Sequence, residues 1–72
     1  MVIVNVAQKG DQLKEAILAA EIANTLELKF DKKEGMKYYF TTNNDDVAVT
    51  EIKKFIKATP AFAFLYTSVM KK

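Results

Sequence analysis

Short apolar runs alternate with polar segments along the chain and divide it into predicted strands and helices. Residues 2–6 form a β-branched run, interrupted only by Asn5, that is typical of a buried central strand. Residues 26–30 and 36–41 alternate apolar and polar side chains with the two-residue period of a half-buried strand. A polar loop ending in Gly35 separates them, and a hairpin loop accepts glycine in a left-handed position. These two stretches therefore predict a β-hairpin.

Two further segments have the residue types and the periodicity of helices. From Gln12 to about Asn24 the chain consists mostly of strong helix formers, and Asp11 is the expected N-cap. The stretch from Ala48 to Lys57 places its apolar residues on a single stripe. It follows a polar segment in which either Asn44 or Asp45 is expected to cap the helix. Both segments therefore predict amphipathic helices that pack on the sheet.

The final apolar run, from Pro60 to Met70, begins at the proline that ends the second helix and fits two templates. As a helix it would be capped by Thr59 and would start at Pro60. As a strand it alternates, and its aromatic residues share one face: Phe62, Phe64 and Tyr66. Ala63 and Leu65 then lie on the other face. The alternation of large and small side chains favours the strand, and the helix stays as the alternative.

The elements follow the order β-α-β-β-α-β within one α+β domain over residues 1–72, which is the pattern of the ferredoxin-like sandwich. Two right-handed crossovers would place both helices on one face of a four-stranded antiparallel sheet with strand order 4-1-3-2. A helical final run would instead give a three-stranded sheet with a third, C-terminal helix. In the preferred arrangement these residues pack beneath the helices: Val2, Val4, Val6, Leu26, Leu28, Phe30, Met36, Tyr38, Phe40, Phe62, Phe64 and Tyr66.

The opposite face of the predicted sheet carries a mixture of apolar and polar residues: Ile3, Asn5, Lys29, Lys37, Tyr39, Thr41, Ala63, Leu65 and Thr67. The first helix also has a second apolar pair, Leu18 and Ile22, nearly opposite its main stripe. A small domain can use such surfaces to bind a second copy or another protein.

Composition narrows the class of protein. With 72 residues the domain buries only about 60% of its unfolded surface, so its margin of stability is small. Hydrophobic residues make up 50% of the chain, which excludes the disordered class. There is no cysteine, and hence neither a disulfide nor a thiolate-bound metal. No apolar run approaches about 20 residues, so we expect a soluble, cytoplasmic protein with no membrane association.

The side chains used most often in catalysis are missing. All eleven basic residues are lysine, and the chain has neither histidine, the usual proton shuttle, nor arginine, which binds phosphate through two hydrogen bonds. Without histidine or cysteine, no Ser-His or Cys-His pair can form around Ser68. Residues 43–46 lack the spacing of a calcium loop and are explained by helix capping. We therefore expect no enzyme, no cofactor and no metal site.

The function expected from these observations is binding. The leading hypothesis is self-association, as a homodimer, or binding of a protein partner, through these residues of the sheet or the first helix: Ile3, Tyr39, Ala63, Leu65, Leu18 and Ile22. The alternative is weak binding of single-stranded nucleic acid on the open sheet face, with Tyr39 stacking on a base between Lys29 and Lys37. A third hypothesis, supported only by fold analogy, is a ligand pocket between two subunits near the loop of residues 8–11.

Overall fold

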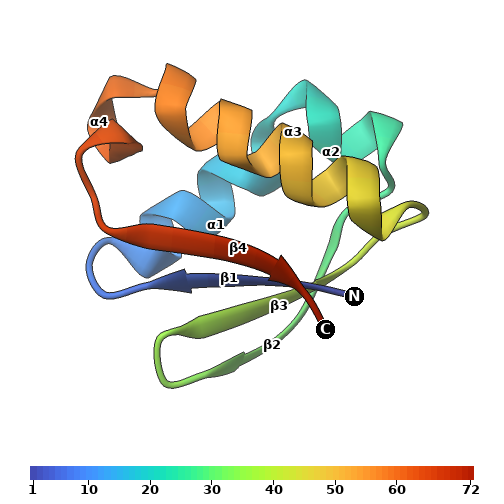
Figure 1. Cartoon of the computed structure of the whole chain (residues 1–72), viewed down its shortest axis with the longest axis horizontal. Coiled ribbons are helices and arrows are strands. Elements are labelled where there is room, and N and C mark those ends of the chain that lie inside the picture. The colour runs from blue at the N-terminus through green and yellow to red at the C-terminus, as the bar shows by residue number, and fades with distance from the viewer.

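The computed structural model describes residues 1–72 and folds the chain into a layer of helices on a sheet (Figure 1). In chain order the elements are β1 (Val2–Val6), α1 (Gly10–Ala19), α2 (Glu21–Thr25), β2 (Lys29–Glu34), β3 (Lys37–Thr41), α3 (Asp45–Ala58), α4 (Pro60–Ala63) and β4 (Thr67–Lys71). The strands form one antiparallel sheet in the order β2-β3-β1-β4. The α+β class and the four-stranded antiparallel sheet are therefore confirmed, with four helical segments in place of the two predicted.

β1 lies in the interior of the sheet because it is the strand that can be buried on both faces. Its Val4 lies opposite Tyr38 of β3 and Val69 of β4, all on the side of the helices. Ile3, on the other face, is only 8% exposed. The two margins of the sheet are β2 and β4. Inner strands are shielded on both sides by their neighbours and can be apolar on both faces. The marginal strands meet water at their outer edge and are more polar.

The core lies between the sheet and the helices. Its largest fully buried side chains come from β1, β3, α1 and α3: Phe40, Leu13, Ile17, Ile52, Val2 and Val4. Each such side chain contributes about 1.5–3 kcal/mol through removal of its surface from water. Leu18 and Ile22, the surplus apolar pair of the first helical segment, are half-buried and pack against this core.

The first helical segment differs from its prediction in two ways. It is divided into α1 and α2 at Ala20, whose backbone is extended. It also starts at Gly10, after Lys9 in the left-handed region with φ 56°, and no side chain caps it. The expectation of Asp11 as the N-cap is wrong, because Asp11 lies inside the first turn and its carboxylate instead accepts a hydrogen bond of 3.1 Å from the Tyr38 hydroxyl.

The hairpin is confirmed, with shifted boundaries. β2 starts at Lys29 and continues to Glu34, so Leu26 and Leu28 precede the strand, although both are buried as expected. Gly35 has the predicted left-handed backbone, with φ 60°. The prediction that Met36 points into the core is wrong: it is 54% exposed, because it lies in the turn itself, before the first residue of β3.

The start of α3 agrees with the sequence pattern. Asn44 is the N-cap, and its side-chain oxygen accepts a hydrogen bond of 3.1 Å from the backbone N–H of Val47. Asp45 and Asp46 lie in the first turn, and Lys57 lies in the last, as the helix dipole favours. Ala48, Ile52 and Ile56 form the buried stripe.

The final run combines the two predicted alternatives. Pro60 starts the short helix α4 after Thr59, because its fixed φ suits the first turn of a helix. The chain then descends to the sheet and becomes β4 at Thr67 (Figure 1). Phe62 is buried as expected, but the predicted burial of Phe64 and Tyr66 is wrong, since they are 95% and 93% exposed. They lie in the connection between the helical layer and the sheet, where strand alternation does not apply.

Candidate binding surface at the edge of β4

A hollow of about 370 Å³ lies between the C-terminal half of α3, α4 and the start of β4. Half of its eight lining residues are apolar, and we call these its floor: Ile56, Ala63, Leu65 and Val69. The others are polar or basic: Lys53, Lys57, Thr67 and Ser68. We call this hollow the β4 hollow. α3 contributes the two lysines and Ile56 through residues one helical turn apart.

The start of β4 presents unpaired backbone groups beside this hollow. The backbone N–H of Val6 donates to the carbonyl of Met36 at 3.0 Å, so the polar groups of Val6 face β3. In an antiparallel ladder these groups alternate in direction from one residue to the next. Thr67 and Val69 lie opposite Val6 and Val4, and their N–H and C=O groups therefore point out of the sheet. This margin is a free strand edge.

The charges around the β4 hollow have one sign. No carboxylate is among its lining residues, and neither Lys53 nor Lys57 forms an ion pair. Their neighbour Lys54, in contrast, pairs with Glu51 at 3.7 Å. At the far end of β4, Lys71 pairs with Asp46 at 2.7 Å, which raises the pKa of Lys71 above 10.5 through hydrogen bonding and charge. The hollow is therefore a cationic site with an apolar floor.

Two aromatic side chains lie next to this hollow. Phe64 and Tyr66 flank Leu65, and all three line a second, smaller hollow of about 180 Å³ together with Ala7 and Gln8. Leu65 belongs to both hollows and packs against the core. The apolar surface thus extends from the β4 hollow over the loop that follows β1.

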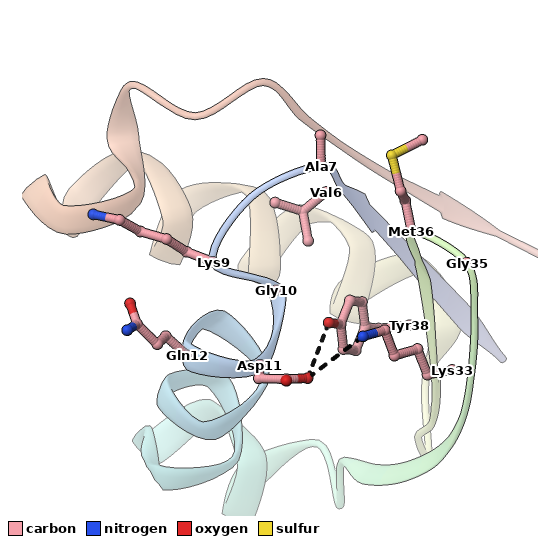
Figure 2. Close-up of a pocket in the computed structure, with 10 residues that line it drawn as sticks. All are labelled: Val6, Ala7, Lys9, Gly10, Asp11, Gln12, Lys33, Gly35, Met36 and Tyr38. Carbon is pink, nitrogen blue, oxygen red and sulfur yellow. Dashed lines mark hydrogen bonds and ion pairs between the residues drawn. The ribbon is translucent and has the colours of Figure 1, made fainter.

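The loop after β1 borders a third pocket, of about 350 Å³, shown in Figure 2. Asp11 lies at its centre, where it accepts a hydrogen bond from Tyr38 and pairs with Lys33 at 3.8 Å. Hydrogen bonding to Tyr38, and then the charge of Asp11, raise the pKa of Lys33 above 10.5. Lys9 points away from this cluster (Figure 2). Asp11 and Lys33 therefore satisfy each other and connect the hairpin to α1.

The structure places the predicted site residues on three separate surfaces. Ala63 and Leu65 both line the β4 hollow, although neither is on the open sheet face as expected, since Ala63 is in α4 and Leu65 follows it. Ile3 and Tyr39 do lie on the open face, opposite each other in register. Leu18 is half-buried on α1, in contact with the core, as is Ile22 on α2.

On the open sheet face, Tyr39 is covered by lysine side chains. Tyr39 is only 7% exposed, with the ammonium groups of Lys32 and Lys72 at 5.0 and 5.8 Å from its ring centre. A hydrogen bond to Glu34, together with burial, raises the pKa of Tyr39 above 10.0. Lys37 and Lys29 are exposed, but the ring between them does not offer a bare face for stacking.

Sequence reasoning did not identify the free edge of β4, nor Lys53 and Lys57 as part of a site. The available signal was a pair of lysines four residues apart beside the apolar stripe of α3. No group of three or more acidic side chains that could hold a metal ion is present. No helix has both the length and the apolar character needed to cross a bilayer.

In comparisons with known proteins, no protein-family model, no curated protein and no solved structure matches this chain.

Proposed function

We propose that this chain is a non-catalytic domain of the ferredoxin-like βαββαβ class that binds a protein partner at the edge of β4. The observation that carries the proposal is an apolar hollow bordered directly by a free strand edge. A strand edge offers backbone hydrogen bonds, and an adjacent hollow accepts side chains, which together bind an extended peptide. The lack of histidine, cysteine and arginine supports a binding role over catalysis.

A different protein suits this edge better than a second copy does. If two copies paired β4 with β4, each would bring the lysines of its hollow, Lys53 and Lys57, and Lys71 at the end of β4 to the same interface. Like charges placed directly opposite in a sheet are destabilising. Of these, only Lys71 has a carboxylate partner in its own chain, Asp46. The charge distribution therefore favours a partner whose charges differ from those of this chain.

Single-stranded nucleic acid on the open sheet face has less support. Base stacking needs an exposed aromatic face, and Tyr39 is covered by lysine side chains. The surplus pair Leu18 and Ile22 also offers less surface than expected, because both residues pack against the core. The β4 hollow is the place where predicted candidates, Ala63 and Leu65, come together in one site.

The proposal is tested by selection from a displayed library of random peptides, followed by affinity measurements on two variants. Ala63→Phe fills the β4 hollow, while Ala61→Phe adds the same side chain to an exposed position of α4 outside the hollow. We expect selected peptides to bind Ala63→Phe about tenfold more weakly than the native chain, a loss of about 1.4 kcal/mol. Binding to Ala61→Phe should be unchanged. Failure to enrich any peptide, or equal binding to both variants, would refute the proposal.

A further inference from the structure

The chemistry of the β4 hollow specifies the partner more closely, on the basis of the function proposed above. We infer that the edge of β4 binds an extended acidic segment of another protein, which pairs with β4 as an additional strand. Three features of the structure carry this inference: the outward backbone groups of Thr67 and Val69, the apolar floor beside them, and two lysines without partners.

Strand addition follows from the position of the outward backbone groups. The N–H and C=O groups of Thr67 and Val69 recur at every second residue, which is the spacing that an added antiparallel or parallel strand requires. Side chains of the added strand alternate between the two faces of the sheet. Those on the helical side enter the β4 hollow and meet Ile56 and Leu65. An aliphatic side chain at these positions is therefore favoured.

The acidic character follows from the lysines of α3. Lys53 and Lys57 lie four residues apart on one face of the helix, at the rim of the hollow, and neither has an ion-pair partner. In a strand, residues two positions apart share one face. A segment with Glu or Asp two residues from its aliphatic residue, on either side, therefore presents carboxylates on the helical face, where Lys53 and Lys57 lie. No carboxylate among the lining residues competes with it or repels it.

The two margins of the sheet differ in the way that this inference requires. β2, at the opposite margin, carries charges of both signs, including an ion pair of 3.8 Å between Lys32 and Glu34. Its pairing with β3 also shifts register between Phe30 and Lys32. Charges and register irregularities protect a strand edge against pairing with other chains. At β4, the ion pair between Lys71 and Asp46 protects only the C-terminal end of the strand edge, and the edge remains accessible at the start of the strand.

The test uses two fluorescent peptides with Gly-Ser flanks. In one, Glu, Val and Glu occupy every second position of a core of about five residues, with Ser between them, so that all three share one face; in the other, Gln replaces every Glu. We expect the Glu peptide to bind the native chain at least about fivefold more tightly than the Gln peptide, and to weaken as salt screens the charges. Lys53→Gln with Lys57→Gln should remove this preference. The matched control Lys54→Gln, on the same helix but paired with Glu51, should keep it.

Hydrogen exchange followed by NMR distinguishes strand addition from a general electrostatic contact. The amide protons of Thr67 and Val69 should gain protection when the Glu peptide binds, while that of Ser68, which faces β1, should not change. Equal binding of the two peptides, or no added protection, would overturn the inference. If the Gln peptide binds as well and Ala63→Phe still weakens it, the proposed function stands without acidic specificity. If neither peptide binds, or if a thymidine oligonucleotide displaces the Glu peptide, the inference is also overturned.

Discussion

Gly10, the first residue of α1, lies where no side chain fits. A Cβ atom built there would overlap the hydroxyl of Tyr38 and lie 2.6 Å from two of its ring carbons. Tyr38 cannot easily move aside, because it is 4% exposed and held by the hydrogen bond from its hydroxyl to Asp11. We therefore predict that Gly10→Ala destabilises the fold, although alanine is the better helix former.

The magnitude follows from three contributions. Forcing an extra carbon into a packed site costs about 1–3 kcal/mol. Loss of the hydrogen bond between Tyr38 and Asp11 adds about 0.5–1.5 kcal/mol. The helical preference of alanine over glycine offsets about 0.5–1 kcal/mol. The net loss in unfolding free energy is about 0.5–4 kcal/mol. Each kcal/mol lowers the Tm of a domain of this size by about 4–8 °C.

Denaturant unfolding of a double-mutant cycle separates the overlap from other causes. In a Tyr38→Leu background the ring is absent, so Gly10→Ala should become neutral or stabilising by up to about 1 kcal/mol. The coupling between the two positions should therefore reach about 2 kcal/mol. If Gly10→Ala cost the same in both backgrounds, the close approach of Tyr38 would not be the reason for glycine at this position.

Three further predictions test the fold. Phe62→Ala should lower the free energy of unfolding by about 3–5 kcal/mol, because Phe62 is buried. Phe64→Ala should change it by less than about 0.5 kcal/mol, because Phe64 is exposed. Similar losses for the two variants in thermal or denaturant unfolding would contradict the placement of α4. Asn44→Ala should lower the free energy of unfolding by about 1 kcal/mol through loss of the cap of α3, whereas Asn44→Asp should retain most of the native stability. An unchanged unfolding midpoint for the alanine variant would argue against this cap. The third concerns pH: Asp46 raises the pKa of Lys71, so their pair stabilises the fold below about pH 10.5 and is lost as pH rises through the raised pKa. Any stability advantage of the native chain over Lys71→Met should therefore shrink as pH rises from 10.5 through the raised pKa of Lys71, and an advantage that does not change with pH there would refute the pairing.

Local signals in the sequence predicted several elements correctly. Alternation and a glycine at the turn predicted the hairpin, because a period of two residues and a left-handed position are properties of the strand and the turn themselves. The acidic and amide side chains before α3 predicted its cap, because capping depends only on residues within one turn. The β-branched run of β1 predicted an inner strand for the same kind of reason.

The candidate site was predicted only in part. Ala63 and Leu65 were chosen as the outer face of a strand, yet they line the β4 hollow from a helix and a connection. Pattern alone could not show this, because a helix of four residues is much shorter than the window of about 11 residues over which helical periodicity can be recognised. Tyr39 lies on the open face of the sheet, as expected, but its burial depends on Lys32 of β2 and Lys72 at the C-terminus.

The α+β class, the hairpin, the cap of α3 and the absence of histidine, cysteine and arginine can all be recognised from the order of the residues. These follow from short-range periodicity, from turn and cap chemistry, and from composition. The folded arrangement, in contrast, shows where the final run changes from helix to strand, and hence that Phe64 and Tyr66 are exposed. It also shows that the edge of β4 borders a cationic hollow. The physical reason is that burial and charge at this edge depend on which elements far apart in the chain come to lie side by side.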